Sequence, residues 1–166
     1  TSHPPVTCFA LDNHLGRLAA YLRMLGIDTY YQNYIQDADL VAYALENNRA
    51  VLTRDRQILM RKVVVHGYLV RSKDPLQQVV EVINRYHLGS QVKPFYRCLK
   101  CNGVRQTVGK EQVLHLLEPL TIKYFDEYSQ CPECQQVYWK GSHYQRMLRI
   151  LSQVMPTSAS NGPGIE

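Results

Sequence analysis

The sequence predicts an α/β fold in which a mostly parallel sheet is flanked by helices, followed by a small cysteine-containing domain. Short apolar runs alternate with amphipathic stripes through residues 1–90, which is the order of elements in a parallel sheet. Two C-x-x-C pairs then fall within residues 91–155, where the composition changes. We therefore expect a sheet domain over 1–90, a cysteine-containing domain over 91–155 and a disordered tail over 156–166, which is rich in Ser, Gly and Pro.

The strand candidates are short apolar runs, which suit strands that are buried on both faces. They cover residues 6–11, 27–31, 50–52 and 67–70. Between them, apolar residues recur three and four positions apart, as they do on one face of a helix. These helix candidates cover residues 15–25, 37–47 and 75–85, and a further helix opens at 53–55. Because parallel strands end at one edge of a sheet, residues that follow the strands are candidates for a functional site.

The charge balance is mildly basic and is compatible with a nucleic-acid partner. Lys and Arg number 19 against 14 Asp and Glu, which gives a net charge of +5 and a pI near 9.0. No apolar run approaches the roughly 18 residues of a membrane helix, and the first residues do not resemble a signal peptide. We expect a cytoplasmic protein without a membrane partner. The chain starts at Thr1 and could be part of a longer protein.

Four of the five cysteines form two identical pairs with the spacing of a structural zinc site. These cysteines are Cys98, Cys101, Cys131 and Cys134. Four thiolates leave no coordination position for water, so a zinc ion here would hold the fold and perform no chemistry. The 29 residues between the pairs exceed the usual interval, and a helix over 110–118 is the expected insertion. A pair of disulfides is the alternative. A final helix is expected over 144–154.

Basic and aromatic side chains alternate around the two cysteine pairs. They are Lys93, Arg97, Lys100, Arg105, Lys123 and Lys140, with Tyr96, Tyr124, Tyr128, Tyr138 and Trp139 among them. Basic side chains attract phosphates and aromatic faces stack on bases, so this region could be a surface that grips RNA. Alternatively, the aromatic residues form the small core of the ribbon.

Several aspartates fall where the expected strands end or the helices begin. Asp12 comes directly after the first strand and Asp55 three residues after the third, while Asp37 and Asp39 open the helix that leads into the third strand. Carboxylates gathered at one sheet edge repel one another unless a divalent cation neutralises them, and hard carboxylate oxygens suit Mg²⁺ or Mn²⁺. Helix capping is the alternative for Asp12, Asp37, Asp55 and also Asp74.

Four stretches of the chain resemble the Mut-seven C-terminal RNase domain, a branch of the PIN-like nucleases. Residues 11–29 read LDNHLGRLAAYLRMLGIDT, and residues 37–44 and 50–55 read DADLVAYA and AVLTRD. The paired C-x-x-C motifs are followed at 138–143 by YWKGSH, which is also similar to this family. The resemblance spans about residues 6–150.

The resemblance implies a PIN-like fold with a zinc ribbon, and a metal-dependent endoribonuclease that hydrolyses RNA. The residues that it places at the Mg²⁺ or Mn²⁺ ion are Asp12, Asp37 and Asp55, with Asp39 as an auxiliary acid. Bacterial members often carry a ubiquitin-like segment ahead of this domain. PIN nucleases commonly use a fourth acid, whereas residues 13–36 contain only Asp28, which we expect in a strand. An adaptor of the same fold that binds RNA or protein without cleaving RNA is therefore the alternative.

Three cations and one hydroxyl group lie near the predicted acids in the sequence. Arg17 and Arg54 could each clamp the scissile phosphate, or pair with the neighbouring carboxylate and orient it. Thr53 could position an acid through a hydrogen bond. Arg23 is expected on a face turned to solvent or RNA, with a solvated surface preferred. The sequence leaves the oligomeric state open.

Overall fold

The computed structural model describes residues 6–154 of the 166-residue chain. One compact unit ends at Asn102 and a second begins at Gly103, and each is described by itself. Residues 91–102, which the sequence assigns to the second domain, thus lie in the first unit. The predicted disordered tail, 156–166, lies outside the described residues. Among residues 6–154, no helix combines the length and the apolar character needed to cross a membrane.

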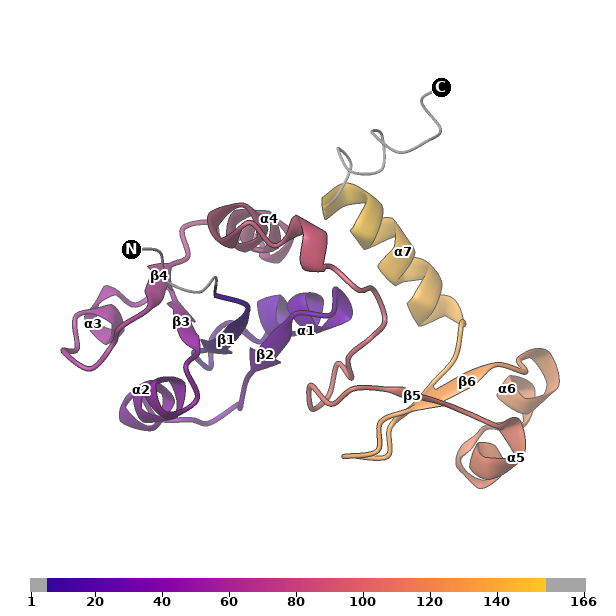
Figure 1. Cartoon of the computed structure of the whole chain (residues 1–166). Coiled ribbons are helices and arrows are strands. Elements are labelled where there is room, and N and C mark those ends of the chain that lie inside the picture. The colour runs from indigo at the N-terminus through magenta and orange to yellow at the C-terminus, as the bar shows by residue number, and fades with distance from the viewer. Residues whose placement is uncertain (1–5, 155–166) are drawn as a thin grey trace. The chain divides into compact units, whose positions relative to one another are not determined.

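A four-stranded parallel sheet organises the first unit (Figure 1). Its strands are β1 (Cys8–Leu11), β2 (Asp28–Tyr30), β3 (Ala50–Thr53) and β4 (Gly67–Leu69). They lie in the order β2-β1-β3-β4, and all three pairings are parallel. The α/β prediction is confirmed. Leu11 pairs with Leu52, so the carboxyl ends of β1 and β3 lie level with each other.

Helices follow the strands as the apolar periodicity predicts. They are α1 (Gly16–Met24), α2 (Asp37–Glu46), α3 (Arg56–Leu59) and α4 (Pro75–Tyr86), and the short 3-10 helix η1 (Gly89–Gln91) follows. In Figure 1, α2 and α4 lie on opposite sides of the sheet. On the α2 side, Ala10 and Val51 pack with Leu40. Phe9, which alternates with Ala10, instead contacts Tyr86 of α4, with 4.9 Å between the ring centroids.

The segment that follows η1 packs against the end of α1 and the start of β2. Lys93 N donates to Leu25 O at 2.8 Å, and Asn102 Oδ1 accepts from Thr29 N at 3.0 Å. Gly26 has a φ of +84°, and a side chain there would overlap the carbonyl oxygen of Lys93. These long-range bonds explain why the compact unit extends to Asn102.

The second unit contains a three-stranded antiparallel sheet and a small core. Its strands, in the order β5-β6-β7, are β5 (Gln106–Val108), β6 (Tyr128–Gln130) and β7 (Val137–Tyr138). Its helices are α5 (Lys110–Val113), the 3-10 helix η2 (Leu114–Leu116), α6 (Pro119–Tyr124) and α7 (Ser142–Val154). In place of the single helix expected over 110–118, the structure has two short helices that together cover 110–116. Val113, Tyr128 and Val137 form the core, with Trp139 packed against it, so these two aromatic residues serve the ribbon core.

Candidate active site and metal centre

Asp12 lies at the carboxyl edge of the sheet, where β1 ends beside β3. Its backbone N–H donates to Leu52 O at 3.1 Å, which continues the pairing of the two strands by one residue. The residue is only 4% exposed. Its Oδ1 accepts from His14 N at 2.7 Å, and its Oδ2 accepts from the Thr53 hydroxyl at 2.5 Å. Both oxygens of this buried carboxylate are therefore held in fixed positions, as the cost of burying a charge requires.

Thr53 connects Asp12 to Asp55. It is fully buried at the end of β3, and its hydroxyl donates to Asp12 while accepting from Asp55 N at 2.9 Å. Asp55 in turn caps α3, because its Oδ1 accepts from Gln57 N at 2.9 Å. The hydrogen bond expected from Thr53 to an acid is present, and its role in substrate binding stays a prediction. One hydroxyl group thus fixes two acidic residues that come from neighbouring strands.

Asp37 and Asp39 lie in the first turn of α2 and are exposed. Gln36, not Asp37, occupies the cap position of this helix, so capping does not explain Asp37. Within residues 6–154, the acidic and histidine side chains do not form a group of three or more with ligand atoms as close as those of the cysteines described below. The role of Asp37 and Asp39 at a shared ion stays a prediction.

The capping alternative holds for some of the predicted acids and fails for others. Asp55 caps α3, and Asp74 caps α4 by accepting from Gln77 N at 3.1 Å. Asp12 caps no helix, because Leu15 occupies that position at the start of α1. The burial of Asp12 therefore needs another explanation than helix capping.

Asp28 lies in β2 as expected and takes part in an ion pair away from Asp12. Arg49 contacts its Oδ1 at 2.8 Å, and Asn102 Nδ2 donates to the same oxygen at 2.7 Å. Burial by itself would raise the pKa of Asp28, but the bonds from Arg49 and Asn102 lower it below the ordinary value. This carboxylate is thus committed to a structural ion pair.

The predicted arginines contact other groups than the predicted acids. Arg17 is exposed and donates to the Tyr21 hydroxyl at 3.2 Å. The Arg54 guanidinium donates to three consecutive carbonyl oxygens of the loop after β4, those of Val70, Arg71 and Ser72, at 3.3, 2.7 and 2.9 Å. Neither has an ion pair with a carboxylate in the described part of the chain.

The prediction that Arg23 faces solvent is wrong. The residue is 5% exposed, and its guanidinium donates to Thr29 O and Leu99 O, each at 3.0 Å. The sequence pattern of α1 leaves this position outside the apolar stripe. It is covered nevertheless, because residues 93–102 pack over that part of the helix.

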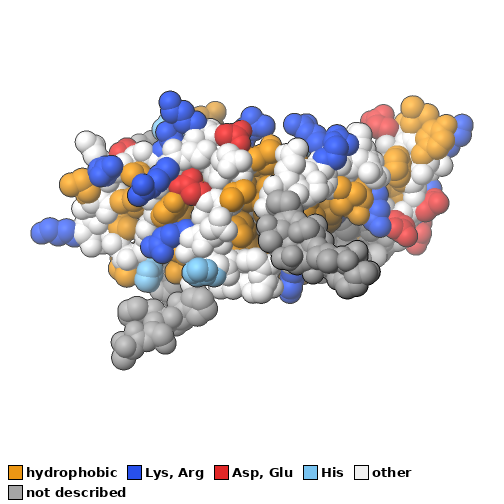
Figure 2. Space-filling model, turned by 90° about the horizontal axis from the view of Figure 1, so that it is seen from above, with side chains coloured by type: hydrophobic (Ala, Val, Ile, Leu, Met, Phe, Trp, Pro, Cys, Tyr) orange, Lys and Arg blue, Asp and Glu red, His pale blue; other side chains and the backbone are white. Residues whose placement is uncertain are grey.

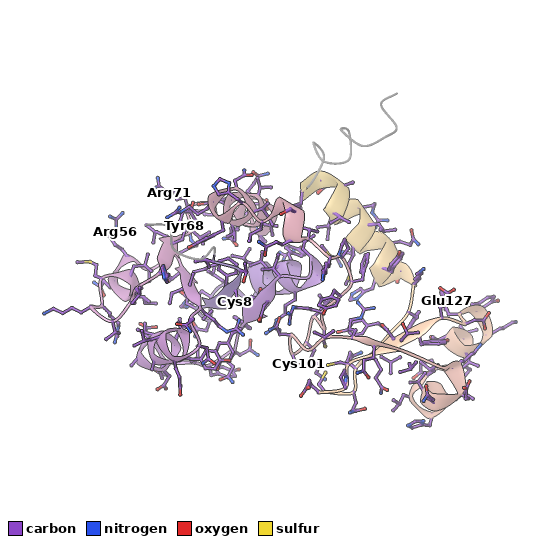
Figure 3. All side chains as sticks on the ribbon, viewed as in Figure 1. Cys8, Arg56, Tyr68, Arg71, Cys101 and Glu127 are labelled. Carbon is purple, nitrogen blue, oxygen red and sulfur yellow. The ribbon has the colours of Figure 1, made fainter. Side chains whose placement is uncertain are left out.

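A carboxylate that the sequence analysis did not single out holds the loop after β4. Glu81 of α4 accepts from the Tyr68 hydroxyl at 2.5 Å, from Arg71 N at 2.8 Å and from Ser72 N at 3.1 Å. In Figure 3, Tyr68 and Arg71 lie next to α4. Burial alone would raise the pKa of Glu81, but these three bonds lower it, while burial and the bond to Glu81 raise the pKa of Tyr68 to about 12.

A polar hollow of about 560 Å³ opens beside the end of β2. The residues that line it include Gly16, Arg23, Tyr31, Asn33, Tyr34 and Lys100. Tyr31 also donates from its hydroxyl to Asn13 O at 2.8 Å, directly after Asp12 in the chain. Sequence reasoning missed this hollow, although the exposed run of polar and aromatic residues after β2 is a signal that could have indicated it.

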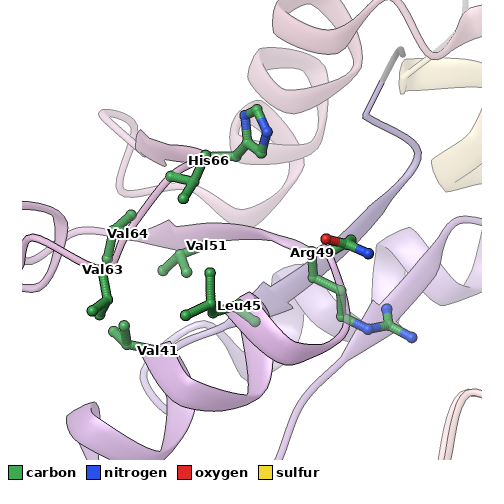
Figure 4. A pocket seen from close by; sticks show the side chains of 10 residues that line it. Val41, Leu45, Arg49, Val51, Val63, Val64 and His66 are labelled. Atoms are coloured by element: carbon green, nitrogen blue, oxygen red, sulfur yellow. The ribbon is translucent and has the colours of Figure 1, made fainter. Parts of the chain in front are cut away.

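A second pocket, of about 90 Å³, has an apolar lining (Figure 4). Val41, Val51 and Val63 contribute to its walls, and the Arg49 side chain extends away from these valines toward its partner Asp28. None of the predicted site residues lines this pocket, so it is not part of the candidate active site.

The four cysteines of the two C-x-x-C pairs gather into one centre. Their sulfur atoms all lie within 4.8 Å of one another, and Cys98 and Cys131 are fully buried. In the described residues no disulfide joins these cysteines, and their clustering favours a metal site over the alternative of two disulfides. Zn–S bonds of about 2.3 Å in a tetrahedron bring sulfur atoms to this range of separations, so the group could bind a metal such as zinc.

The two C-x-x-C turns have the same backbone shape, which suits metal binding. Asn102 and Gln135, each directly after the second cysteine of its pair, have φ values of 77° and 70°. The N–H of each donates back to the carbonyl of the first cysteine, Cys98 or Cys131, at 2.9 and 2.8 Å. Gly103 completes the arrangement, because a Cβ there would lie 2.8 Å from the Cys131 sulfur. A side chain at position 103 would therefore crowd the Cys131 sulfur.

Comparison with known proteins gives one family. The model of the Mut7-C RNAse domain matches residues 7–151, which is most of the chain and nearly the range expected from the sequence motifs. The searches of curated proteins and of solved structures found no match.

Proposed function

The chain belongs to the Mut7-C RNase domain family, and from this membership we propose that it is a metal-dependent ribonuclease whose reaction centre lies at Asp12 and Asp55. The observation that carries the proposal is the link from Asp12 through Thr53 to Asp55 at the carboxyl edge of the sheet. In parallel sheets, this edge is where ligands bind. A buried aspartate that caps no helix is best explained by a role at that site.

The donor set fits a hard divalent cation, Mg²⁺ or Mn²⁺. Asp12 offers two carboxylate oxygens in fixed positions, and Asp55 uses one oxygen as a helix cap, which leaves the other for an ion. Carboxylate oxygens completed by water are typical ligands of these ions. Asp37 and Asp39 are exposed in the first turn of α2 and would supply further carboxylates.

The chemistry proposed is hydrolysis of an RNA phosphodiester. A divalent cation, when bound, lowers the pKa of water and neutralises charge on the phosphate. Asp12 and Asp55 hold that ion, while Thr53 keeps the Asp12 carboxylate from rotating. The attacking water gives up a proton and its oxygen forms a bond to phosphorus, the bond from phosphorus to one ribose oxygen breaks, and that ribose oxygen takes up a proton.

Basic side chains on the surface are the expected contacts for the phosphates of RNA. Figure 2 shows Lys and Arg side chains spread over the visible face with Asp and Glu side chains between them. Arg17 is exposed at the start of α1, close in sequence to Asp12, and is suited to contact a phosphate. Arg54 is already bonded to three carbonyl groups, so we assign it to the shape of the site and not to RNA.

Cleavage of a labelled single-stranded RNA with Mn²⁺ tests the proposal. We expect Asp12→Asn and Asp55→Asn each to lower the cleavage rate by about 100-fold or more, because each removes a charge that binds the ion. Asp74→Asn is the matched control: Asp74 also stands at a helix start in the same unit, and Asn can keep its capping role. Cleavage that survives both site substitutions would remove the proposed centre.

An adaptor that binds RNA or protein without cleavage is the second candidate. Two observations favour it: α1 carries no acidic residue, and the acids in the described residues do not gather as closely as the cysteines. The same assay separates the two functions. RNA binding without cleavage in Mg²⁺ and in Mn²⁺ would favour the adaptor.

A further inference from the structure

We propose that the hollow beside β2 binds one unpaired nucleotide of a single-stranded RNA, next to the bond that is cut. This inference rests on the proposed ribonuclease function, because it assigns a position to the substrate of that site. The residues concerned are above all Gln32, Asn33 and Tyr34, which are not among the RNA contacts predicted for the acid site.

The hollow and Asp12 share one wall. Tyr31 lines the hollow, and its hydroxyl donates to the carbonyl of Asn13, the residue that follows Asp12. Burial raises the pKa of Tyr31, and the negative charge of Asp12 raises it further. Gly16 permits this contact, because a Cβ there would lie 2.9 Å from the Tyr31 hydroxyl oxygen. A chain bound at Asp12 therefore needs to extend only a short way to enter the hollow.

The lining has the chemistry of a nucleotide site. Gln32 and Asn33 offer amide donors and acceptors that can pair with the edges of a base. Tyr34 lines the hollow and is 89% exposed, so its ring is accessible, and unpaired bases stack on such rings. The volume of about 560 Å³ lies within the range of about 300–1,000 Å³ that is usual for small-ligand sites.

The charge of the hollow favours an anion. Arg23 and Lys100 line it, and its lining residues include no Asp or Glu. Lys100 is exposed and can contact a phosphate, whereas Arg23 is buried and fixes the wall through its bonds to Thr29 O and Leu99 O. The cation can contact a phosphate, the amide groups can pair with the edge of a base, and the aromatic ring can stack on its face. A protein partner would not need this combination.

The test measures equilibrium binding of a fluorescent single-stranded RNA of about 12 nucleotides to the full chain carrying Asp12→Asn, so that binding is separated from cleavage. Tyr34→Ala in this background is expected to raise the Kd about fivefold or more, while Tyr34→Phe binds within twofold of the parent, because the ring stacks and the hydroxyl does not. Lys100→Gln is expected to weaken binding and to lower the salt dependence by about one phosphate contact.

Two matched controls come from exposed residues outside the hollow. Met60→Ala removes a large side chain that is 73% exposed, and Lys62→Gln removes one exposed lysine charge; both should bind like the parent. The fully paired duplex of the same RNA should bind equally to parent and Tyr34→Ala, because its bases are not free to stack.

The outcomes separate this inference from the function on which it rests. If Tyr34→Ala binds the single strand within twofold of the parent, or weakens duplex binding equally, the hollow does not bind an unpaired nucleotide. That result would leave the proposed reaction centre in place. No RNA binding by the parent contradicts both. As a second measurement, RNA that contains 5-iodouridine should cross-link under light to Tyr34, and cross-links confined to residues 103–154 would overturn the inference.

Discussion

At the scale of single residues, Thr53 is the group on which the geometry of the acid site depends. Its hydroxyl donates to a carboxylate that is 4% exposed and accepts from the N–H of the next acid in the site. We expect Thr53→Val, which keeps the shape and removes the hydroxyl, to lower the free energy of unfolding by about 1.5–3 kcal/mol, the usual worth of a hydrogen bond to a charged group.

Urea unfolding with Thr53→Ser as the matched control checks this expectation. Serine keeps the hydroxyl and removes one methyl group, so the free energy of unfolding should fall clearly less in Thr53→Ser than in Thr53→Val. Equal stability of the valine and serine variants would contradict the assigned role. RNA cleavage should follow the same order, because a carboxylate that rotates freely no longer holds an ion in one position.

Sequence reasoning could reach the acid site at residue scale only in part. Asp12 and Asp55 follow β1 and β3, and Thr53 ends β3, so the order of elements places them at one edge of the sheet; that β1 lies directly beside β3 is seen only in the structure. Arg23 could not be placed, because its partner Leu99 comes from a segment far along the chain. Periodicity describes one helix and does not reveal what later packs over it.

At the scale of elements, every strand and helix predicted in the first unit is present, because the apolar spacing that buries a face also fixes the type of element. The loop after β4 is different. Its shape depends on hydrogen bonds from Arg54 and to Glu81, and no local pattern announces such a network. The shape of this loop is fixed by charged side chains whose positions in the sequence do not distinguish them from solvent-exposed ones.

The Glu81 network gives a pH-dependent prediction. The pKa of Glu81 is below its ordinary value of 4.5, so its stabilising contribution is complete above about pH 4.5 and is lost as the pH falls through the lowered pKa. We expect Glu81→Gln to lower the free energy of unfolding by about 1–2 kcal/mol at pH 7, because the glutamine amide has one oxygen that accepts hydrogen bonds where the carboxylate has two.

Urea unfolding of parent and variant at pH 7 and pH 4 measures the difference between them. The difference should shrink at pH 4, below the ordinary pKa of 4.5, because the Glu81 carboxylate of the unfolded chain then takes up a proton more readily than that of the folded chain. Any loss of metal at low pH should affect both chains alike. A difference that stays constant or grows toward pH 4 would show that Glu81 does not act through its charge.

At the scale of the whole molecule, the chain divides into a sheet unit with a large core and a second unit with a small one. A core of this size needs further support, which a metal such as zinc would provide when bound by the four cysteines. We expect one zinc ion per chain, and its removal by a chelator should shift the fluorescence of Trp139, the single tryptophan, which packs against the small core.

Native mass spectrometry and tryptophan fluorescence check the zinc prediction together. Cys131→Ser should lose the ion and show the altered fluorescence, whereas Cys8→Ser should keep both properties of the parent, because Cys8 lies in β1 outside the cysteine centre. A metal-free chain with unchanged Trp139 fluorescence would contradict a structural role for zinc.

Binding of Mn²⁺ to the zinc-loaded chain, followed by electron paramagnetic resonance, directly tests whether Asp12 and Asp55 hold a divalent cation. We expect one Mn²⁺ site whose affinity is about tenfold weaker or more in Asp12→Asn and in Asp55→Asn, and unchanged in Asp74→Asn. Equal Mn²⁺ affinity in the parent and all three variants would contradict it.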